Sequence, residues 1–476
     1  MDRRNFIERL TMGGGALATS SLMGFSVPEN QQTKRIKREE SDQKLTADVV
    51  IIGAGLGGCA AAFSALRNNL TVVLTEETDW VGGQLTQQGV PPDEHMWIET
   101  HGAPQLYRDF RTAIRAYYKK NYPLTEQAKA VQYLNPGSGS VSKLCHEPQV
   151  AVSVLMEMMA PYISAQKLVL LTEHKVVNAA VEKDEVRSVN VKNLRNKQTV
   201  TLSGSYFVDA TELGDLLPLT GTEYVTGTES KAQTNELHAP DKANPKNNQA
   251  FTMCFAIDYA PGEDWTIKKP AEYDFWKEFV PKMRIPWSGK MIGLHYSDPR
   301  TLKPKELGFH PDGRQTGSML NLWNYRKIIN RENFVPGFYK GDITIVNWPQ
   351  NDYVLGDIVD VSEEVFNKHV YRAKQQSLSL LYWLQTEAPR PDGGKGWPGV
   401  RLRKDIMGTD DGLAKYPYIR EARRIKALFT VLEEHVGAEN RAKITGQTSG
   451  LTSAPFYDSV GVGYYHIDLH PSSDGE

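Results

Sequence analysis

Three carboxylates within seven residues mark the end of an apolar run in YFVDATELGDLLPLTG, residues 206–221; they are Asp209, Glu212 and Asp215. Such a group could hold a metal ion, act as an acid–base pair, or surround a cofactor. Hard cations need about six or more oxygen ligands, and the neighbouring sequence supplies neither these nor histidines. We therefore interpret the acids as a collar around a cofactor. Asp215 could alternatively be a helix N-terminal acid that the helix dipole stabilises.

A second titratable cluster lies in SVGVGYYHIDLHP, residues 459–471. If this segment is an extended strand, alternate side chains share one face. These are Tyr464, His466, Asp468 and His470. Histidine changes charge near neutral pH and suits a general base, which a neighbouring aspartate can orient. We predict that His466, Asp468 and His470 are catalytic; the alternative is a solvent-facing edge strand.

The element that would position a cofactor is ADVVIIGAGLGGCAAAFSALRNNLTVVLTEE, residues 47–77. Val49–Ile52 is the apolar, β-branched run expected of a strand buried on both faces of a parallel sheet. It leads directly into a G-x-G-x-x-G pattern formed by Gly53, Gly55 and Gly58. These glycines suit a tight turn, the close approach of a pyrophosphate, and close helix packing. The pattern predicts a dinucleotide-binding βαβ unit.

The remainder of that unit follows in order. A helix is predicted over Cys59–Arg67, and its amino terminus would offer N–H groups to phosphates. A second strand, Thr71–Leu74, is followed by Glu76, which is placed to accept hydrogen bonds from a ribose hydroxyl. The Gly82–Gly83 pair suits a loop whose backbone passes close to a flat ligand.

Longer motifs carry a family resemblance. GAGLGG, TDWVGGQLTQQGVPPDEHMWIE, LCHEP and VDATELGDLLPLTG resemble the FAD-dependent oxidoreductases of the glutathione-reductase-like superfamily, in a poorly characterised bacterial branch. The resemblance runs in order from about Ala47 to His470 and implies FAD as the cofactor. The expected cofactor-binding residues are Gly53, Gly55, Gly58, Glu76, Gly82, Gly83, Gln84, Val176, Asp209, Ala210, Thr211 and Asp215. No metal is expected.

The expected fold is α/β: a glutathione-reductase-like FAD-binding Rossmann domain with an antiparallel β-meander, plus an inserted α+β substrate domain. Two helical patterns, Gln105–Tyr118 and the largely apolar 147–162, precede a strand at Lys167–Leu171. The runs KVVNAAV, VRSVNVKN and QTVTLSG alternate and predict the meander. Tyr206–Val208 would then be the last strand of the nucleotide sheet.

Four regions are expected along the chain. They are a twin-arginine signal and linker at 1–45, the FAD-binding domain at 46–248, the substrate domain at 249–400, and a return segment at 401–476. The signal is predicted from Arg3 and Arg4 before a short, glycine-diluted apolar run, which implies an extracytoplasmic, periplasmic protein. A closing flavin-binding strand and helix is expected but not found before the last residue.

The composition excludes some function classes. The chain has 476 residues, and its 55 Lys+Arg against 57 Asp+Glu do not support nucleic-acid binding. No stable membrane span is expected, because the apolar amino-terminal run is short of about 20 residues. The three cysteines, Cys59, Cys145 and Cys254, lie far apart, which argues against a metal cluster, a redox dithiol or a disulfide framework.

The predicted function is hydride transfer from a small organic substrate to the flavin of an FAD-dependent oxidoreductase, with an unknown electron acceptor. The alternatives are an exported flavin-containing binding or carrier protein without turnover and a NAD(P)-dependent Rossmann enzyme. YPYIREARRIKAL, residues 416–428, predicts a helix on which Arg420, Arg423 and Arg424 share a face. Arg420 and Arg424 would bind a substrate carboxylate or the cofactor phosphates; the alternative is an exposed basic face. Tryptophans at 265, 276, 287, 323 and 348 belong either to the substrate pocket or to the core.

Overall fold

The computed structural model describes residues 36–39, 43–299, 301–315, 317–459, 462–464 and 467–475. The chain forms two compact units, each assembled from separate stretches. The first unit takes Met1–Val81, Met156–Thr211 and Pro218–Gly221, and the second takes Gly82–Leu155, Glu212–Leu217 and Thr222–Glu476. The predicted signal, with Arg3 and Arg4, lies outside the described residues.

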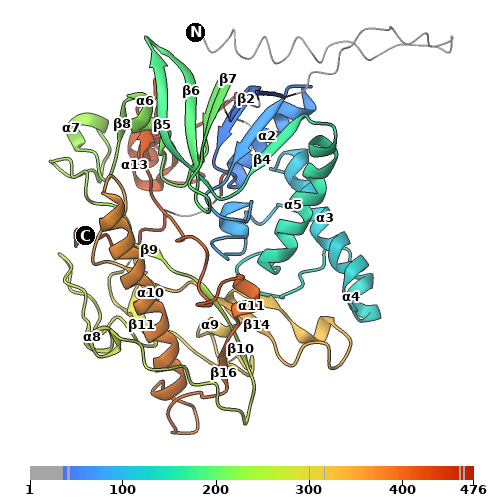
Figure 1. Cartoon of the computed structure of the whole chain (residues 1–476). Helices are drawn as coiled ribbons and strands as arrows, with labels where there is room; N and C mark the ends of the chain where they lie inside the picture. The colour runs from blue at the N-terminus through green and yellow to red at the C-terminus, as the bar shows by residue number, and fades with distance from the viewer. Residues whose placement is uncertain are drawn as a thin grey trace. The chain divides into compact units, whose positions relative to one another are not determined.

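The first unit is built on a seven-stranded sheet in the order β4-β3-β2-β7-β6-β5, with β1 paired to β2. The strands are β1 (Lys37–Glu39), β2 (Lys44–Ile52), β3 (Val72–Thr75), β4 (Leu168–Leu171), β5 (His174–Glu182), β6 (Glu185–Asn193) and β7 (Thr199–Asp209). β2 pairs in parallel with both β3 and β7, and β3 pairs in parallel with β4. β5, β6 and β7 pair antiparallel, which confirms the predicted meander. Figure 1 shows the long hairpin of β5 and β6 in green.

The buried runs read from the sequence form the centre of this sheet. All four residues of β3 are buried, as are the last four residues of β2. Apolar side chains fill both faces of a parallel sheet when other layers cover them, which is why these runs do not alternate. The predicted third meander strand and the predicted last nucleotide strand are one continuous strand, β7, which pairs with β6 on one edge and β2 on the other.

Two helices carry the segments that the sequence singled out. α2 (Leu56–Arg67) follows β2 and buries Cys59, Phe63 and Leu66. α5 (Pro148–Ser164) corresponds to the largely apolar 147–162 pattern, and its apolar composition predicts a buried helix, yet α5 is only partly buried. Its Met156 and Ile163 are 36% and 37% exposed, because apolar content alone does not force every face of a helix into a core.

The second unit contains an antiparallel sheet in the order β13-β14-β10-β16. Its strands are β10 (Phe255–Tyr259), β13 (Lys327–Ile329), β14 (Ile343–Val346) and β16 (Val400–Leu402). The long helix α10 (Glu363–Thr386), orange in Figure 1, begins after Ser362, whose side chain accepts a hydrogen bond from the Val365 N–H. No described helix is both long and apolar enough to cross a membrane.

Buried polar side chains of α10 hold a short strand that matters for the site. β15 (Asp352–Tyr353) pairs with β9 (Phe251–Thr252). The Gln376 amide of α10 donates to the carbonyls of Gln350 and Asp352, each at 3.0 Å. These contacts hold Asp352 in the interior of the second unit, and Asp352 is 0% exposed.

The prediction of a helix at 416–428 is wrong. These residues form no helix: β17 (Arg424–Ile425) pairs with β8 (Tyr224–Val225), and Tyr418 forms an isolated bridge with Thr252. The arginines bind different partners, Arg420 reaching the Ala250 carbonyl and Arg423 the Leu213 carbonyl. On one helix face, by contrast, residues three or four apart would be neighbours.

The predicted strand at the second titratable cluster is also not formed in the described residues 462–464 and 467–475. Instead of strand pairing, individual backbone contacts join residues 471–472 to residues 249–250. The Ala250 N–H donates to the Pro471 carbonyl at 2.9 Å, and Gln249 forms an isolated bridge with Ser472.

Candidate functional site

The glycine turn of the first unit has no room for side chains. Gly53 has φ +96°, and a Cβ there would lie 2.2 Å from the Ala210 carbonyl oxygen. A Cβ at Gly58 would lie 2.0 Å from the Gly53 carbonyl oxygen. A Cβ at Gly57, by contrast, would meet nothing within 4 Å. Gly53 and Gly58 are therefore required by the packing of the turn against the residues that follow β7.

The amino terminus of α2 is prepared for an anion. Gly55 is its N-cap and offers no side chain to the first-turn N–H groups, and the first turn contains no acidic residue. A helix end with unsatisfied N–H groups and a positive dipole end favours a phosphate.

Glu76 ties the glycine turn to the end of β3. Its Oε2 accepts a hydrogen bond from the Ala54 N–H at 3.1 Å, and its Oε1 accepts one from the Thr78 N–H at 2.9 Å. The residue is 3% exposed. The Thr78 hydroxyl also donates to Oε1 at 3.2 Å. An acid after the second strand of a dinucleotide-binding βαβ unit is the residue type that accepts from a ribose hydroxyl.

The segment after β7 lies against the same turn. The Ala210 N–H donates to the Ile52 carbonyl at 2.7 Å, while Thr211 donates through its N–H and hydroxyl to the Asp209 carboxylate. The start of β5 also reaches this end of the sheet, since the His174 N–H donates to the Glu76 carbonyl at 2.8 Å. Val176 follows two residues later and is buried.

These features fit a dinucleotide. A crowded glycine turn, an uncapped helix end and an acid after the second strand meet at the carboxyl ends of parallel strands, where open α/β sheets bind their ligands. The remaining predicted cofactor residues, Gly82, Gly83, Gln84 and Asp215, belong to the second unit.

Those second-unit residues have defined local roles. Gly82 and Gly83 both have positive φ, +111° and +57°, which glycine adopts without strain. The Gln84 amide donates to the Asp93 carboxylate at 3.2 Å. Asp215 forms an ion pair with Arg423 at 3.0 Å, immediately before the short helix α6 (Leu216–Thr220).

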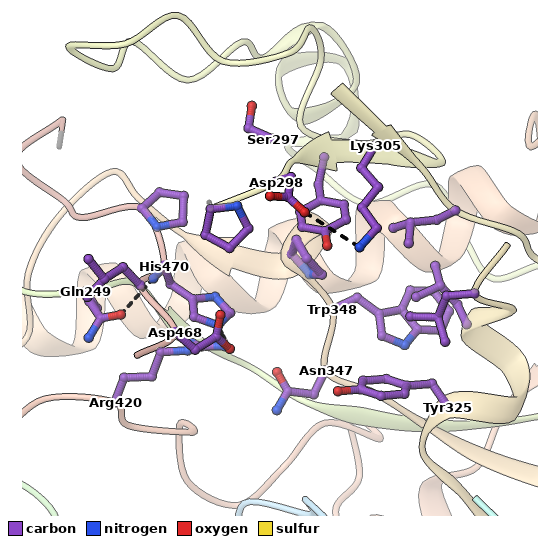
Figure 2. Close-up of a pocket in the computed structure, with 18 of the residues that line it drawn as sticks. Gln249, Ser297, Asp298, Lys305, Tyr325, Asn347, Trp348, Arg420, Asp468 and His470 are labelled. Carbon is purple, nitrogen blue, oxygen red and sulfur yellow. Dashed lines mark hydrogen bonds and ion pairs between the residues drawn. The ribbon is translucent and has the colours of Figure 1, made fainter. Parts of the chain in front are cut away.

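A cavity of about 620 Å³ lies within the second unit. Its walls come from Asp93, Gln249 and segments near 287–307, 320–326, 347–349, 418–420 and 468–471 (Figure 2). It is the place where the structure brings together residues from both predicted reactive segments, with Arg420 on one and Asp468 and His470 on the other.

A buried aspartate anchors the histidine of this cavity. His470 Nδ1 lies 2.6 Å from Asp352 Oδ2. The other oxygen, Asp352 Oδ1, accepts from the Thr252 hydroxyl at 2.6 Å and pairs with Arg420 at 3.0 Å. Asp352 has no exposed side-chain surface, whereas the His470 side chain is 23% exposed. The His470 N–H donates to Gln249 Oε1 at 2.7 Å, a bond drawn in Figure 2.

The charges around the pair move both pKa values. Burial and Arg420 lower the pKa of His470, but the carboxylates of Asp352 and Asp468 outweigh them, so its pKa lies above the usual value. Burial raises the pKa of Asp352, but Arg420 and His470 outweigh it, so its pKa lies below the usual value. The pair is therefore an aspartate beside a histidine that holds its proton readily. Asp468 Oδ2 lies 3.6 Å from His470 Nε2.

The structure separates the two arginines, Arg420 and Arg424, that were predicted to bind a substrate carboxylate or the cofactor phosphates. Arg420 lines the cavity, but its terminal nitrogens already bind the Ala250 carbonyl, the Thr252 hydroxyl and Asp352. Arg424 is not among the cavity residues and pairs with Glu229 at 2.9 Å. His466, the other predicted base, lies outside the described residues.

Sequence reasoning missed three cavity residues or neighbours: Asp352, Arg326 and Asn347. Each sits in or beside an apolar strand of the second unit, and a polar residue in an apolar run is the only local signal. Of the five tryptophans considered, Trp287 and Trp348 line the cavity, Trp276 and Trp323 are fully buried, and Trp265 is 42% exposed.

Metal ligands are not assembled here. Within the described ranges, no group of three or more His, Cys, Asp or Glu side chains could hold a metal ion. Cys59, Cys145 and Cys254 are all buried free thiols.

The profile of the family described as FAD dependent oxidoreductase matches residues 48–476. The chain belongs to this family. This FAD-dependent oxidoreductase is therefore an enzyme with FAD as its cofactor, and both predictions are confirmed.

Other similarities to this oxidoreductase are partial. The carotenoid phi-ring synthase of Chlorobaculum tepidum is 36% identical over 105 residues, which are 21% of this chain and 16% of that protein. A glycerol-3-phosphate dehydrogenase from Bacillus halodurans, solved with FAD, is 14% identical over 45% of this chain and 40% of that chain, with a TM-score of 0.24. An L-proline dehydrogenase from P. horikoshii is 17% identical over 40% of this chain and 25% of that chain, with a TM-score of 0.19.

Proposed function

We propose that this oxidoreductase removes a hydride from a small organic substrate bound in the cavity of the second unit. FAD supplies the hydride acceptor when it is bound. The observation that carries the proposal is the His470–Asp352 pair, which has one partner buried and the other facing the cavity. A substrate that loses a hydride from one carbon also loses a proton from the neighbouring oxygen, nitrogen or carbon, and the pair can receive that proton.

The pair's geometry suits that proton transfer. Asp352 accepts the Nδ1 proton of His470, and this hydrogen bond leaves Nε2 as the atom that takes the substrate proton. Once His470 is protonated, the buried carboxylate stabilises the positive charge. Asp468, beside Nε2, faces the same cavity and would orient the donor group. We thus give Asp352 the orienting role that the sequence suggested for Asp468.

We also propose a fold class, an electron acceptor and an export route. The parallel strands, the glycine turn and the meander support a glutathione-reductase-like class for the first unit. The electron acceptor that reoxidises the flavin is expected to be external. Export by the twin-arginine route rests on Arg3 and Arg4 alone.

Anaerobic reduction of the bound flavin tests the proposal. Sugars, amino acids and hydroxy acids are added to the purified holoprotein, and loss of the flavin absorbance identifies the substrate class. With that substrate, His470→Gln should slow reduction by about 10²–10⁴-fold in stopped flow, the usual contribution of a positioned base.

A matched control is available in the same unit. His238 also places Nδ1 2.6 Å from a carboxylate, that of Glu433, but its side chain is 63% exposed and is not part of the cavity. His238→Gln should leave the reduction rate unchanged. A flavin that no candidate bleaches would favour a carrier without turnover. A wild-type rate in His470→Gln would place the base elsewhere.

A further inference from the structure

Several residues that line the cavity carry buried polar atoms without hydrogen-bond partners. Five such atoms belong to four of its lining residues: Arg326 Nε, Asn347 Nδ2, Asn347 Oδ1, Trp287 Nε1 and Trp348 Nε1. Four are N–H donors and one is an acceptor. An unpaired buried polar group costs about 1–3 kcal/mol, so their concentration at one cavity indicates a ligand that supplies the missing partners. Asn347 is 3% exposed, and Figure 2 draws its amide turned away from Tyr325, toward the side of the cavity that carries Asp468.

Arg326 is the unusual member of this set. It is 9% exposed, donates through Nη1 to the Asn347 carbonyl at 3.1 Å, and stacks over the Tyr325 ring at 4.6 Å. Among the residues that the structure describes, it forms no ion pair, and its Nε has no acceptor. Asp93 lines the same cavity and attracts Arg326, but the two, both within the described ranges, do not form an ion pair.

The other cations of the cavity are already matched. Lys305 lies 3.6 Å from the Asp298 carboxylate, and Arg420 pairs with Asp352. A buried guanidinium is costly unless an anion or several acceptors compensate it. Arg326 is thus the cation of this cavity that an incoming anion would neutralise.

We propose that the substrate is a small organic acid whose carboxylate binds Arg326 and Asn347, with the indole N–H groups of Trp287 and Trp348 donating to its remaining acceptors. The side-chain oxygen of Asn347, Oδ1, then accepts from the hydroxyl or amino group that the acid carries. This inference rests on the proposed function, since it names the substrate class of the same cavity.

The donor set favours a carboxylate over a phosphate. A guanidinium matches the planar carboxylate geometry. A phosphate dianion would call for a second uncompensated cation, and the described lining offers none, because Lys305 and Arg420 already have carboxylate partners. The aromatic side chains around Arg326 suit a compact acid with an apolar body.

Ligand binding to the full-length holoprotein tests the assignment without turnover. Benzoate, benzamide and phenyl phosphate have the same ring but carry a carboxylate, a neutral amide and a phosphate. Their affinities are measured by calorimetry, with tryptophan fluorescence as a second readout because Trp287 and Trp348 line the cavity. We expect benzoate to bind at least about tenfold more tightly than the other two, the effect of one charge-assisted pair. Equal affinity for benzamide, or tighter binding of phenyl phosphate, would overturn the proposal.

Variants then locate the carboxylate. Arg326→Gln should lower benzoate affinity about 10–100-fold and remove the preference over benzamide, and Asn347→Ala should weaken benzoate alone by a smaller factor. Arg314→Gln is the control, because Arg314 pairs with Asp312 outside this cavity. Retained preference in Arg326→Gln contradicts the assignment. If that variant does not fold, the three-ligand comparison on the unmodified protein still decides.

The result is separable from that of the proposed function. Carboxylates that bind through Arg326 while no acid bleaches the flavin would uphold this inference and contradict the dehydrogenase reaction. Bleaching by neutral alcohols or sugars, with no binding of benzoate, would do the reverse.

Discussion

His470 Nδ1 lies 2.6 Å from Asp352 Oδ2, with the aspartate fully buried and the histidine at the surface of a cavity. The aspartate is itself bound by Arg420 and by the Thr252 hydroxyl. Protonation of the histidine is therefore coupled to a charged group that solvent does not reach, and this coupling can be measured in both catalysis and stability.

The first prediction concerns the pH dependence of flavin reduction. His470 accepts a proton only when it is neutral, and its pKa is raised, so the rate should increase with pH through that raised value. Asp352→Asn removes a carboxylate that raises the pKa and leaves burial and Arg420, which lower it. The inflection of the stopped-flow rate should therefore move to lower pH. An unchanged inflection would mean that another group controls the rate.

Stability should follow the same pair. His470 has a raised pKa in the folded protein, so its contribution is fully present below the unfolded value, about 6.5, and is lost as pH rises through the folded pKa. Asp352 has a lowered pKa, so its contribution is present above the unfolded value, about 3.9, and is lost as pH falls through the folded pKa. Urea unfolding of wild type and His470→Gln should differ most near pH 5. A difference that grows toward alkaline pH would contradict this.

A third prediction uses the glycine turn. Gly53→Ala and Gly58→Ala place a methyl group against carbonyl oxygens at 2.2 Å and 2.0 Å, so both should abolish FAD binding. Gly57→Ala meets no atom within 4 Å and lies in α2. It should retain FAD and stabilise the helix by up to about 1 kcal/mol. Flavin content after gel filtration and the melting temperature give the comparison; equal flavin content in all three variants would show that the turn does not hold the cofactor.

Glu76 should contribute to both affinity and folding. Glu76→Ala should weaken FAD binding by about 1.5–3 kcal/mol, the value of charge-assisted hydrogen bonds. It also leaves the buried Ala54 N–H without its acceptor, so the apoprotein should unfold at lower urea concentration. Flavin fluorescence titration measures the first effect. Unchanged FAD affinity would limit Glu76 to supporting the turn.

A buried histidine outside the cavity gives the fifth prediction. Burial lowers the pKa of His146 to about 4, and its Nδ1 bonds the Glu147 carbonyl oxygen. Between about pH 6.5 and 4 the unfolded chain takes up a proton that the folded protein does not, so the free energy of unfolding falls by up to about 3 kcal/mol. Urea unfolding of His146→Gln from pH 7.5 to 4.5 should show a smaller decrease than wild type. Parallel curves would contradict the lowered pKa.

Local patterns predicted the first unit well. Its strands are short apolar or alternating runs bounded by turns, and Gly53 and Gly58 are explained by contacts within the βαβ unit and with Ala210. The exact extent of β7 could not be predicted, because the Ser-Gly-Ser stretch at 203–205 resembles a break between two strands, whereas β7 continues through it and is paired on both edges.

The sequence predicted only some of the residues that form the cavity. Asp468 and His470 stand out by alternation, yet the partner that orients His470 is Asp352, more than one hundred residues away. Arg420 was predicted to bind substrate because helical spacing would gather three arginines on one face, but the segment is not helical and Arg420 binds Asp352 instead. Such contacts depend on tertiary packing, which no local period encodes. The predicted domain limits and the export signal stay predictions.

The pairing of β2 with β7 also sets an order for biosynthesis. Lys44 lies opposite Thr201 in this pairing, and residues 82–155, which lie between them in the chain, belong to the other unit. About two hundred residues must therefore be synthesised before β7 can pair with β2. By then residues 82–155 of the second unit have been made, but the strands of that unit's own sheet have not. Contacts between residues so distant in sequence have a large loop-closure entropy cost, and this slows folding. The glycine turn, complete as a sequence after residue 58, thus becomes a binding surface only when Ala210 arrives beneath it.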